Sequence, residues 1–126
     1  MKLALPSYKD GKYIRNKLKI FYEANLSNPC TPRNQEHELK RALIRLFDFF
    51  RLPIPKVEWY ESFGLGSNVL GQCSFEGTIN LLTPYKHPKG FDYWLNTFYH
   101  EIGHYVLWFD WEKKAREFAS KMVSRR

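Results

Sequence analysis

The sequence predicts an α+β fold in which helices come first, a small and mostly antiparallel sheet follows, and two helices end the chain. Three observations support this order: a helical period over residues 35–50, strand-forming runs over 56–83, and a helical period that returns after residue 90. The chain has 126 residues, of which 44% are hydrophobic. These values suit a single globular domain, residues 1–126, built around one core.

The segments differ in how clearly their residues define them. GKYIRNKLKIFYEANL, residues 11–26, fits a helix, although the alternation within KLKIFY leaves a strand open. QEHELKRALIRLFDFF, residues 35–50, repeats leucine and phenylalanine at helical spacing and ends before Pro53. KVEWYES favours a strand, and NVLGQCS and TINLLT, joined by FEG, favour a hairpin. Residues 1–35 therefore form a basic N-terminal extension, either a helix or an arm.

The positive charge is concentrated in the first half of the chain. The net charge is +7, and residues 1–55 hold 11 Lys and Arg against 5 Asp and Glu. This half could contact DNA or an acidic protein partner through a cluster of cations, Lys12, Arg15, Lys17 and Lys19. The alternative is an ordinary solvated basic surface.

The N-terminus and the cysteines indicate where the protein works. The apolar run from Leu3 to Leu5 is too short for a signal peptide or a membrane span, so we expect a cytoplasmic protein without membrane contact. Cys30 and Cys73 lack CxxC spacing and are expected to be plain thiols in a reducing cytosol. A disulfide between them is the alternative if the host is a hyperthermophile.

The segment HEIGH, residues 100–104, carries the most specific chemical signal. His100 and His104 lie four residues apart, so on a helix both imidazoles leave the same face and can reach one metal ion. Glu101 would flank that metal and could deprotonate a water molecule there, as in the HExxH pattern. The alternative is a pair of core histidines that hydrogen bond within the protein.

The helix around this segment is apolar on nearly every side, which is typical of a buried helix. Buried histidines and a glutamate need partners, and a metal ion would provide one. A glycine within a helix lowers the stability of the helix by about 1 kcal/mol relative to alanine. A glycine at such a position often permits the close approach of a neighbouring backbone, and for Gly103 we expect a neighbour such as the sheet.

The third metal ligand is sought downstream, among Asp110, Glu112 and Glu117. On the wheel of the last helix, Glu112 lies within the apolar face, whereas Glu117 lies among Lys and Ser on the wet face. An inward carboxylate needs a cation, so Glu112 is the predicted ligand. Alternatively, Glu112 lies in the first turn of the helix, where the helix dipole favours acidic side chains, and it pairs with Arg116 on the surface. Asp110 would then be the N-cap.

Together these residues resemble a known group of enzymes. HEIGH followed by E-x-x-A-x-x-F-A (Glu112 to Ala119) resembles the gluzincin-type metallopeptidases, in particular the ImmA/IrrE family. The run LGQCSFEGTINLL followed by LNTFYHEIGH is also similar to SprT-like and related minimal zincin domains, where a hairpin strand precedes the active-site helix. The likeness covers roughly residues 38–123 in the order of elements, and about the last 30 residues at the level of motifs.

The resemblance implies a zincin-like fold with one Zn²⁺ ion, His100, His104 and Glu112 as its ligands, and Glu101 as general base. It departs in two places. Arg116 stands where these families usually place Asp or Asn, and no histidine follows His104 to act as the later ligand of SprT-like proteins. ImmA/IrrE proteins often come from mobile elements and cleave or bind a transcriptional repressor. The resemblance therefore implies a viral or plasmid origin and a transcriptional regulator as substrate.

The expected function is hydrolysis of a peptide bond by zinc-assisted water activation, with the peptide paired to a strand of the hairpin. Additional candidates for oxyanion stabilisation or for hydrogen bonding behind the ligands are Thr97, Asn96, Tyr105, His87 and Tyr85. For the last three, core or loop packing is the alternative. The competing function is a non-catalytic module of the same fold that binds a protein partner or DNA.

Overall fold

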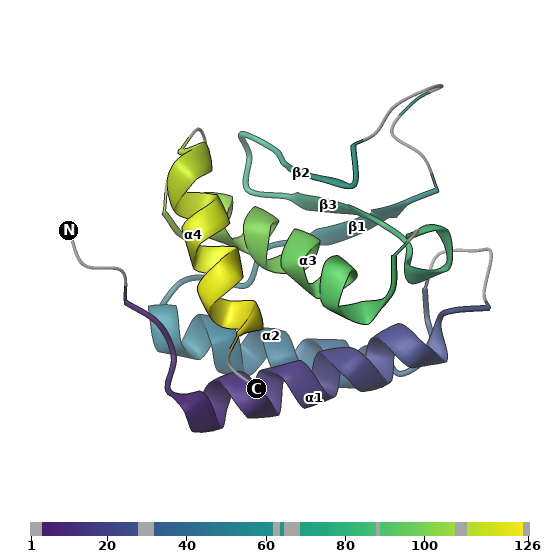
Figure 1. Cartoon of the computed structure of the whole chain (residues 1–126), viewed down its shortest axis with the longest axis horizontal. Helices are drawn as coiled ribbons and strands as arrows, with labels where there is room; N and C mark the ends of the chain where they lie inside the picture. Colours follow the sequence, from purple (N-terminus) through teal and green to yellow (C-terminus); the bar gives the residue numbers. More distant parts are fainter. Residues whose placement is uncertain are drawn as a thin grey trace.

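The computed structural model describes residues 4–27, 32–61, 64, 69–87, 89–107 and 111–124. Within these residues the elements follow the predicted order of helices, strands and helices, which confirms the α+β class (Figure 1). In chain order they are α1 (Tyr8–Ala24), α2 (Glu36–Phe50), β1 (Val57–Tyr60), β2 (Gly71–Cys73), β3 (Ile79–Leu82), the 3₁₀ turn η1 (Pro84–Lys86), α3 (Phe91–Val106) and α4 (Glu112–Val123).

The sheet is mixed, which corrects the prediction of a mostly antiparallel sheet. β3 lies between its two partners; β2 pairs with it antiparallel as the expected hairpin, and β1 pairs with it parallel. Strand propensity identified all three strands, but it carries no information about which strand occupies the middle of a sheet. Since β1 takes the far side of β3, β2 is left as an edge strand.

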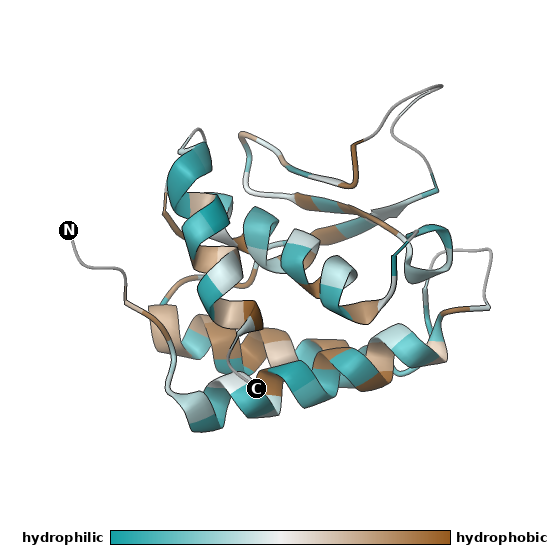
Figure 2. Ribbon diagram, in the orientation of Figure 1, coloured by the Kyte–Doolittle hydropathy of each residue, from teal (hydrophilic) through white to brown (hydrophobic). Residues whose placement is uncertain are grey.

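The N-terminal region is helical, so the strand left open for residues 11–26 does not form. Ser7 begins α1 by accepting a hydrogen bond from the backbone N–H of Asp10 at 3.1 Å. A buried stripe at helical spacing, which includes Ile14, Leu18 and Phe21, packs α1 into the core beside α2. Figure 2 shows hydrophobic and hydrophilic stretches alternating along α1 and α2, as in amphipathic helices.

Ion pairs use several of the cations on α1. Lys17 lies 3.0 Å from the buried carboxylate of Glu38 on α2, and Arg15 lies 3.0 Å from Asp92 at the start of α3. A third pair on α1, Lys19 with Glu23, is looser at 4.0 Å. The first two pairs join α1 to α3 and to α2, and all three use N-terminal cations, so less of this charge is offered to a partner than the sequence alone indicates.

α3 is the central helix of the molecule. The sheet lies on one side of α3 and the α1–α2 pair on the other (Figure 1). Its fully buried side chains include Trp94, Leu95, Phe98 and Ile102, which confirms the buried helix expected from its composition. Among the helices of the described residues, none has both the length and the apolar character needed to cross a bilayer.

Gly103 permits a close approach, but of α4 rather than of the sheet. A Cβ at position 103 would lie 3.1 Å from the Cα of Ala115 and 3.2 Å from the Phe118 ring. The prediction named the wrong neighbour because the sequence of α3 does not reveal which element covers the face that carries Gly103. That face is covered by α4, which folds back against α3. The two helices therefore pack almost backbone to backbone, and this brings the first residue of α4 to the histidines.

Candidate metal centre

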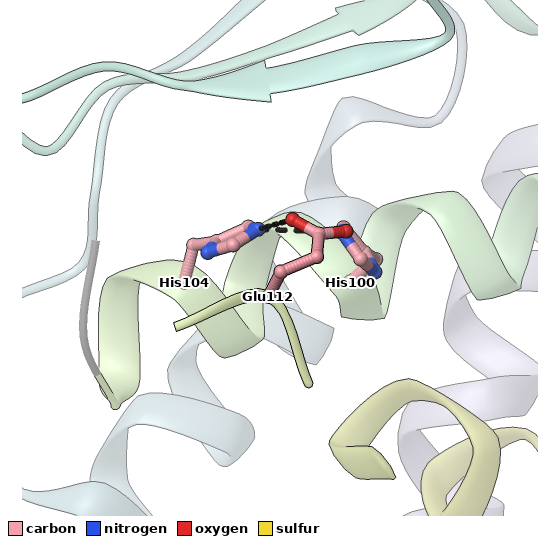
Figure 3. Close-up of side chains that lie close together, drawn as sticks. All are labelled: His100, His104 and Glu112. Carbon is pink, nitrogen blue, oxygen red and sulfur yellow. Dashed lines mark hydrogen bonds and ion pairs between the residues drawn. The ribbon is translucent and has the colours of Figure 1, made fainter. Parts of the chain in front are cut away.

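Three side chains from two helices converge on one point. The Nε2 atoms of His100 and His104 lie 3.2 Å apart, and the Glu112 carboxylate lies between them (Figure 3). One carboxylate oxygen is 2.8 Å from His100 Nε2 and the other is 3.1 Å from His104 Nε2. Each residue offers one ligand atom, and these atoms lie within 4.8 Å of one another, so the group could hold a metal ion.

The local sequence explains how the three residues meet. His100 and His104 lie one turn apart on α3, and Glu112 is the first residue of α4. The N-cap of α4 is Trp111, which makes no side-chain capping hydrogen bond. Asp110 itself lies outside the described residues.

The predicted position of Glu112 needs a partial correction. Its carboxylate faces the two imidazoles as expected, but the side chain is 53% exposed rather than buried. Arg116 Nε lies 3.6 Å from one of its oxygens, so the surface pair considered as the alternative is also present. The wheel misjudged exposure because α4 begins at the rim of the molecule, where its first turn has solvent on one side. Glu117, predicted on the wet face, pairs there with Lys114 and Lys121.

The electrostatics favour His100 in the form that binds metals. Burial lowers the pKa of His100, although the Glu112 carboxylate opposes this shift, and neighbouring His104 supports it. A neutral imidazole keeps a lone pair for a cation. Two imidazoles and one carboxylate are also the donor set of many catalytic zinc sites, which keep a further position open. The residues present therefore fit a zinc ion.

Glu101 lies beside this group and is well shielded from solvent. It is 6% exposed, and burial, with help from the Glu112 carboxylate, raises its pKa to about 7. The backbone N–H of Cys73 on β2 donates a hydrogen bond to the Glu101 carboxylate and opposes this shift. A carboxyl group with a pKa near neutrality can both take and return a proton, as a general base requires.

The edge strand β2 borders the site. Leu82 N–H donates to Leu70 O, and Ser74 N–H donates to Thr78 O, so alternate residues of β2 face β3. The backbone groups of Gly71 and Cys73 therefore point away from β3. Sequence reasoning named the hairpin but missed these two residues as parts of the site. A glycine inside a strand run was the available signal, because it often marks close approach of another group.

Two of the additional candidates lie behind the site. Thr97, one turn before Glu101, contacts the position where a Gly71 Cβ would be, and its hydroxyl donates to Tyr93 O at 3.3 Å. His87 Nε2 lies 3.4 Å from that hydroxyl, and burial lowers the pKa of His87 to about 4. Thr97 also lines the hollow beside His100 and Glu101, whereas His87 does not line it.

The other three candidates lie in different places. Asn96 is exposed and lines a hollow next to His100 and Glu101, so it remains near the site. Tyr105 donates its hydroxyl hydrogen to Pro53 O at 2.8 Å and packs edge-on against Phe47, which is a structural role. Tyr85 is exposed beside Lys86 and does not line the hollow above the ligands.

Cys73 is a free thiol, and burial raises its pKa to about 11, as expected of an unreactive cysteine. Cys30 lies outside the described residues, so the predicted state of the pair is observed for Cys73 alone.

Replacing Gly71 with alanine is expected to disturb Glu101 without removing the metal ligands. The new Cβ would lie 3.0 Å from Leu81 Cδ2, 3.1 Å from Glu101 Cγ and 3.1 Å from Thr97 Cγ2, so the helix and the strand must separate slightly. Zinc binding, measured by titration, should stay close to wild type, while the hydrogen bond from Cys73 to Glu101 weakens. The backbone amide shift of Cys73 in an NMR spectrum reports this bond, and an unchanged shift would contradict the prediction.

Replacing Gly103 with valine is expected to separate α3 from α4 and so to misplace Glu112. The branched side chain has no room against Ala115 Cα at 3.1 Å, and a misfit of this kind costs about 1–3 kcal/mol. The variant should melt earlier and bind zinc more weakly than wild type. As a control, alanine at the exposed position Ser120 on α4 should change neither property.

The chain was compared with protein-family models, with curated proteins and with solved structures, and none of the three comparisons found a match.

Proposed function

We propose that the protein is a zinc-dependent metallopeptidase, related in design to the gluzincins that its motifs resemble. The observation that carries the proposal is the convergence of His100, His104 and Glu112 beside a buried carboxylate, Glu101, at a strand edge. A structural metal site would need the three ligands but not a poised carboxylate or an open hollow above them. Here the hollow over the ligands is lined by β2 and by all four of these side chains.

Glu101 and Cys73 have distinct roles in the proposed hydrolysis. A bound zinc ion would supply Lewis acidity, which polarises a peptide carbonyl and lowers the pKa of water. Glu101 takes a proton from the attacking water and returns it to the departing amine nitrogen, so the carboxylate ends as it began. The raised pKa of Glu101 suits both steps, and the hydrogen bond from Cys73 N–H keeps the carboxylate in place.

The peptide would lie along β2. Because Gly71 and Cys73 direct backbone groups away from β3, an extended peptide could add to the sheet at this edge. The N–H of Cys73 already donates to Glu101, so Gly71 offers the free position for pairing. The pairing would fix the peptide bond above the ligands, which is the orientation that hydrolysis requires.

Glu101→Gln is the deciding variant. It should bind zinc as tightly as wild type but lose peptide hydrolysis by at least about 100-fold, the lower end of what general-base catalysis supplies. Glu117→Gln is the matched control, since Glu117 lies on the outer face of α4 with its lysines. Hydrolysis is followed on a peptide mixture by mass spectrometry, with zinc content measured on the same samples. Equal hydrolysis by wild type and Glu101→Gln would refute the proposal.

A further inference from the structure

A continuous trough follows β2 across the candidate metal centre. Three hollows lie in a row, and the middle one covers the metal ligands. It shares Gly71, His100 and Glu101 with the hollow on one side, and Cys73, Ser74 and His104 with the hollow on the other. The outer hollows have volumes of about 370 and 320 Å³, within the range of sites that bind small ligands.

Both ends of the trough carry large apolar side chains at the surface. Phe75, in the β2–β3 turn, is 86% exposed and lines one outer hollow together with Leu107. At the other end, Val69 is 38% exposed and Tyr93 is 42% exposed. These side chains would gain apolar burial if an occupant of the adjoining hollows covered them.

The trough is acidic although the chain as a whole is basic. Its described lining residues include Glu76, Glu101 and Glu112 and no lysine or arginine. The whole chain has 20 Lys and Arg and a net charge of +7. A bound divalent ion would offset the charges of Glu101 and Glu112, and Glu76 would remain as the carboxylate of the outer hollow at the β2–β3 turn. An occupant with an acidic side chain is therefore disfavoured in that outer hollow.

The shape of the trough selects an extended occupant. It runs along the edge strand whose outward backbone groups can pair with a peptide. In an extended peptide, side chains two residues apart point to the same face, so one residue before and one residue after the central peptide bond can both face the trough. The outer hollows stand where such side chains would be received.

We propose that the trough selects peptide segments with large apolar or aromatic side chains on both sides of the bond over the candidate metal ligands, and that it disfavours Asp or Glu in the outer hollow lined by Glu76. The inference rests on the proposed function, since it names the substrate class of the same site. Phe75 is the specificity-determining residue at the β2–β3 turn, and Tyr93 has the same role at the opposite end.

Three fluorogenic peptides of one scaffold test this, with phenylalanine, glycine or aspartate flanking the central bond. The zinc-loaded wild type should cleave the phenylalanine peptide fastest and the aspartate peptide slowest. Phe75→Ser should lower kcat/KM for the phenylalanine peptide about tenfold, the equivalent of one lost apolar contact, and should lower it less for the glycine peptide. Ile44→Ser is the matched control: Ile44 is 56% exposed on α2, which lies beyond α3 from the sheet (Figure 1).

Binding of the same peptides to zinc-loaded Glu101→Gln separates the two proposals. Cleavage without preference among the peptides, or a Phe75→Ser variant with the wild-type preference, overturns the inference and leaves the peptidase proposal standing. If no peptide is cut but the phenylalanine peptide binds best and Phe75→Ser weakens it, the inference holds and hydrolysis falls. If none of the three peptides is cut or bound, the inference is overturned.

Discussion

Replacing Glu112 with alanine is expected to weaken zinc binding by more than about 100-fold, because even outer partners of metal ligands are worth about 10- to 100-fold in affinity. Glu112 is the only ligand of the described group that comes from α4, and its two oxygens lie 2.8 and 3.1 Å from the histidines. Two imidazoles alone would leave zinc with fewer protein ligands than either structural or catalytic sites usually have.

The measurement is a zinc titration against a competing chelator, with metal content determined after dialysis. Glu117→Ala on the outer face of the same helix is the control, and it should bind zinc like wild type. The fold of Glu112→Ala should persist, because the side chain is 53% exposed. Unchanged zinc affinity in the Glu112→Ala variant would show that the ion, if bound, is held elsewhere.

In the zinc-free protein, Glu101→Gln is expected to raise the free energy of unfolding above pH 7 by roughly 3 kcal/mol, since a pKa difference of one unit is worth about 1.4 kcal/mol. The pKa of Glu101 is about 7 in the folded chain, against an ordinary value of 4.5. The folded state therefore holds the proton more tightly than the unfolded state does. Ionisation costs stability progressively as the pH rises from 4.5 to 7, and the cost is constant above that.

His87 acts in the opposite direction over an overlapping range. Its pKa is lowered to about 4 from 6.5 by burial, so its contribution is complete above pH 6.5 and is lost as the pH falls to 4. The two effects partly cancel in the wild type, and only the difference between variant and wild type isolates Glu101. Urea unfolding with a chelator present, from pH 4 to pH 8, measures that difference. A constant gap between the two proteins across this range would contradict the assigned pKa.

The candidate metal ligands could be named from the sequence because their signals are local. Spacing within HEIGH places two imidazoles on one helical face, and the wheel of the last helix distinguishes Glu112 from Glu117. Both signals depend only on helical geometry, and the two helices form where they were expected. The three candidate ligands were therefore predicted from the sequence, and the structure shows that their ligand atoms lie close together.

What the sequence could not supply depends on contacts between distant segments. The parallel pairing of β1 with β3, the N–H of Cys73 on Glu101 and the Ala115 backbone against Gly103 all require the folded arrangement. Helical periodicity also places Glu112 on a face without revealing that the helix starts at the rim, which is why its exposure was misjudged.

The open side of β2 also bears on how the protein behaves at high concentration. Unpaired strand edges are places where a second copy of a chain can add, and proteins commonly guard them with charge. Glu101 stands at this edge beside Cys73, so its ionised form makes the approach of another β2 unfavourable. The Glu101 carboxylate can therefore oppose self-association through β2. Preparations of the Glu101→Gln variant should be monitored for self-association by light scattering.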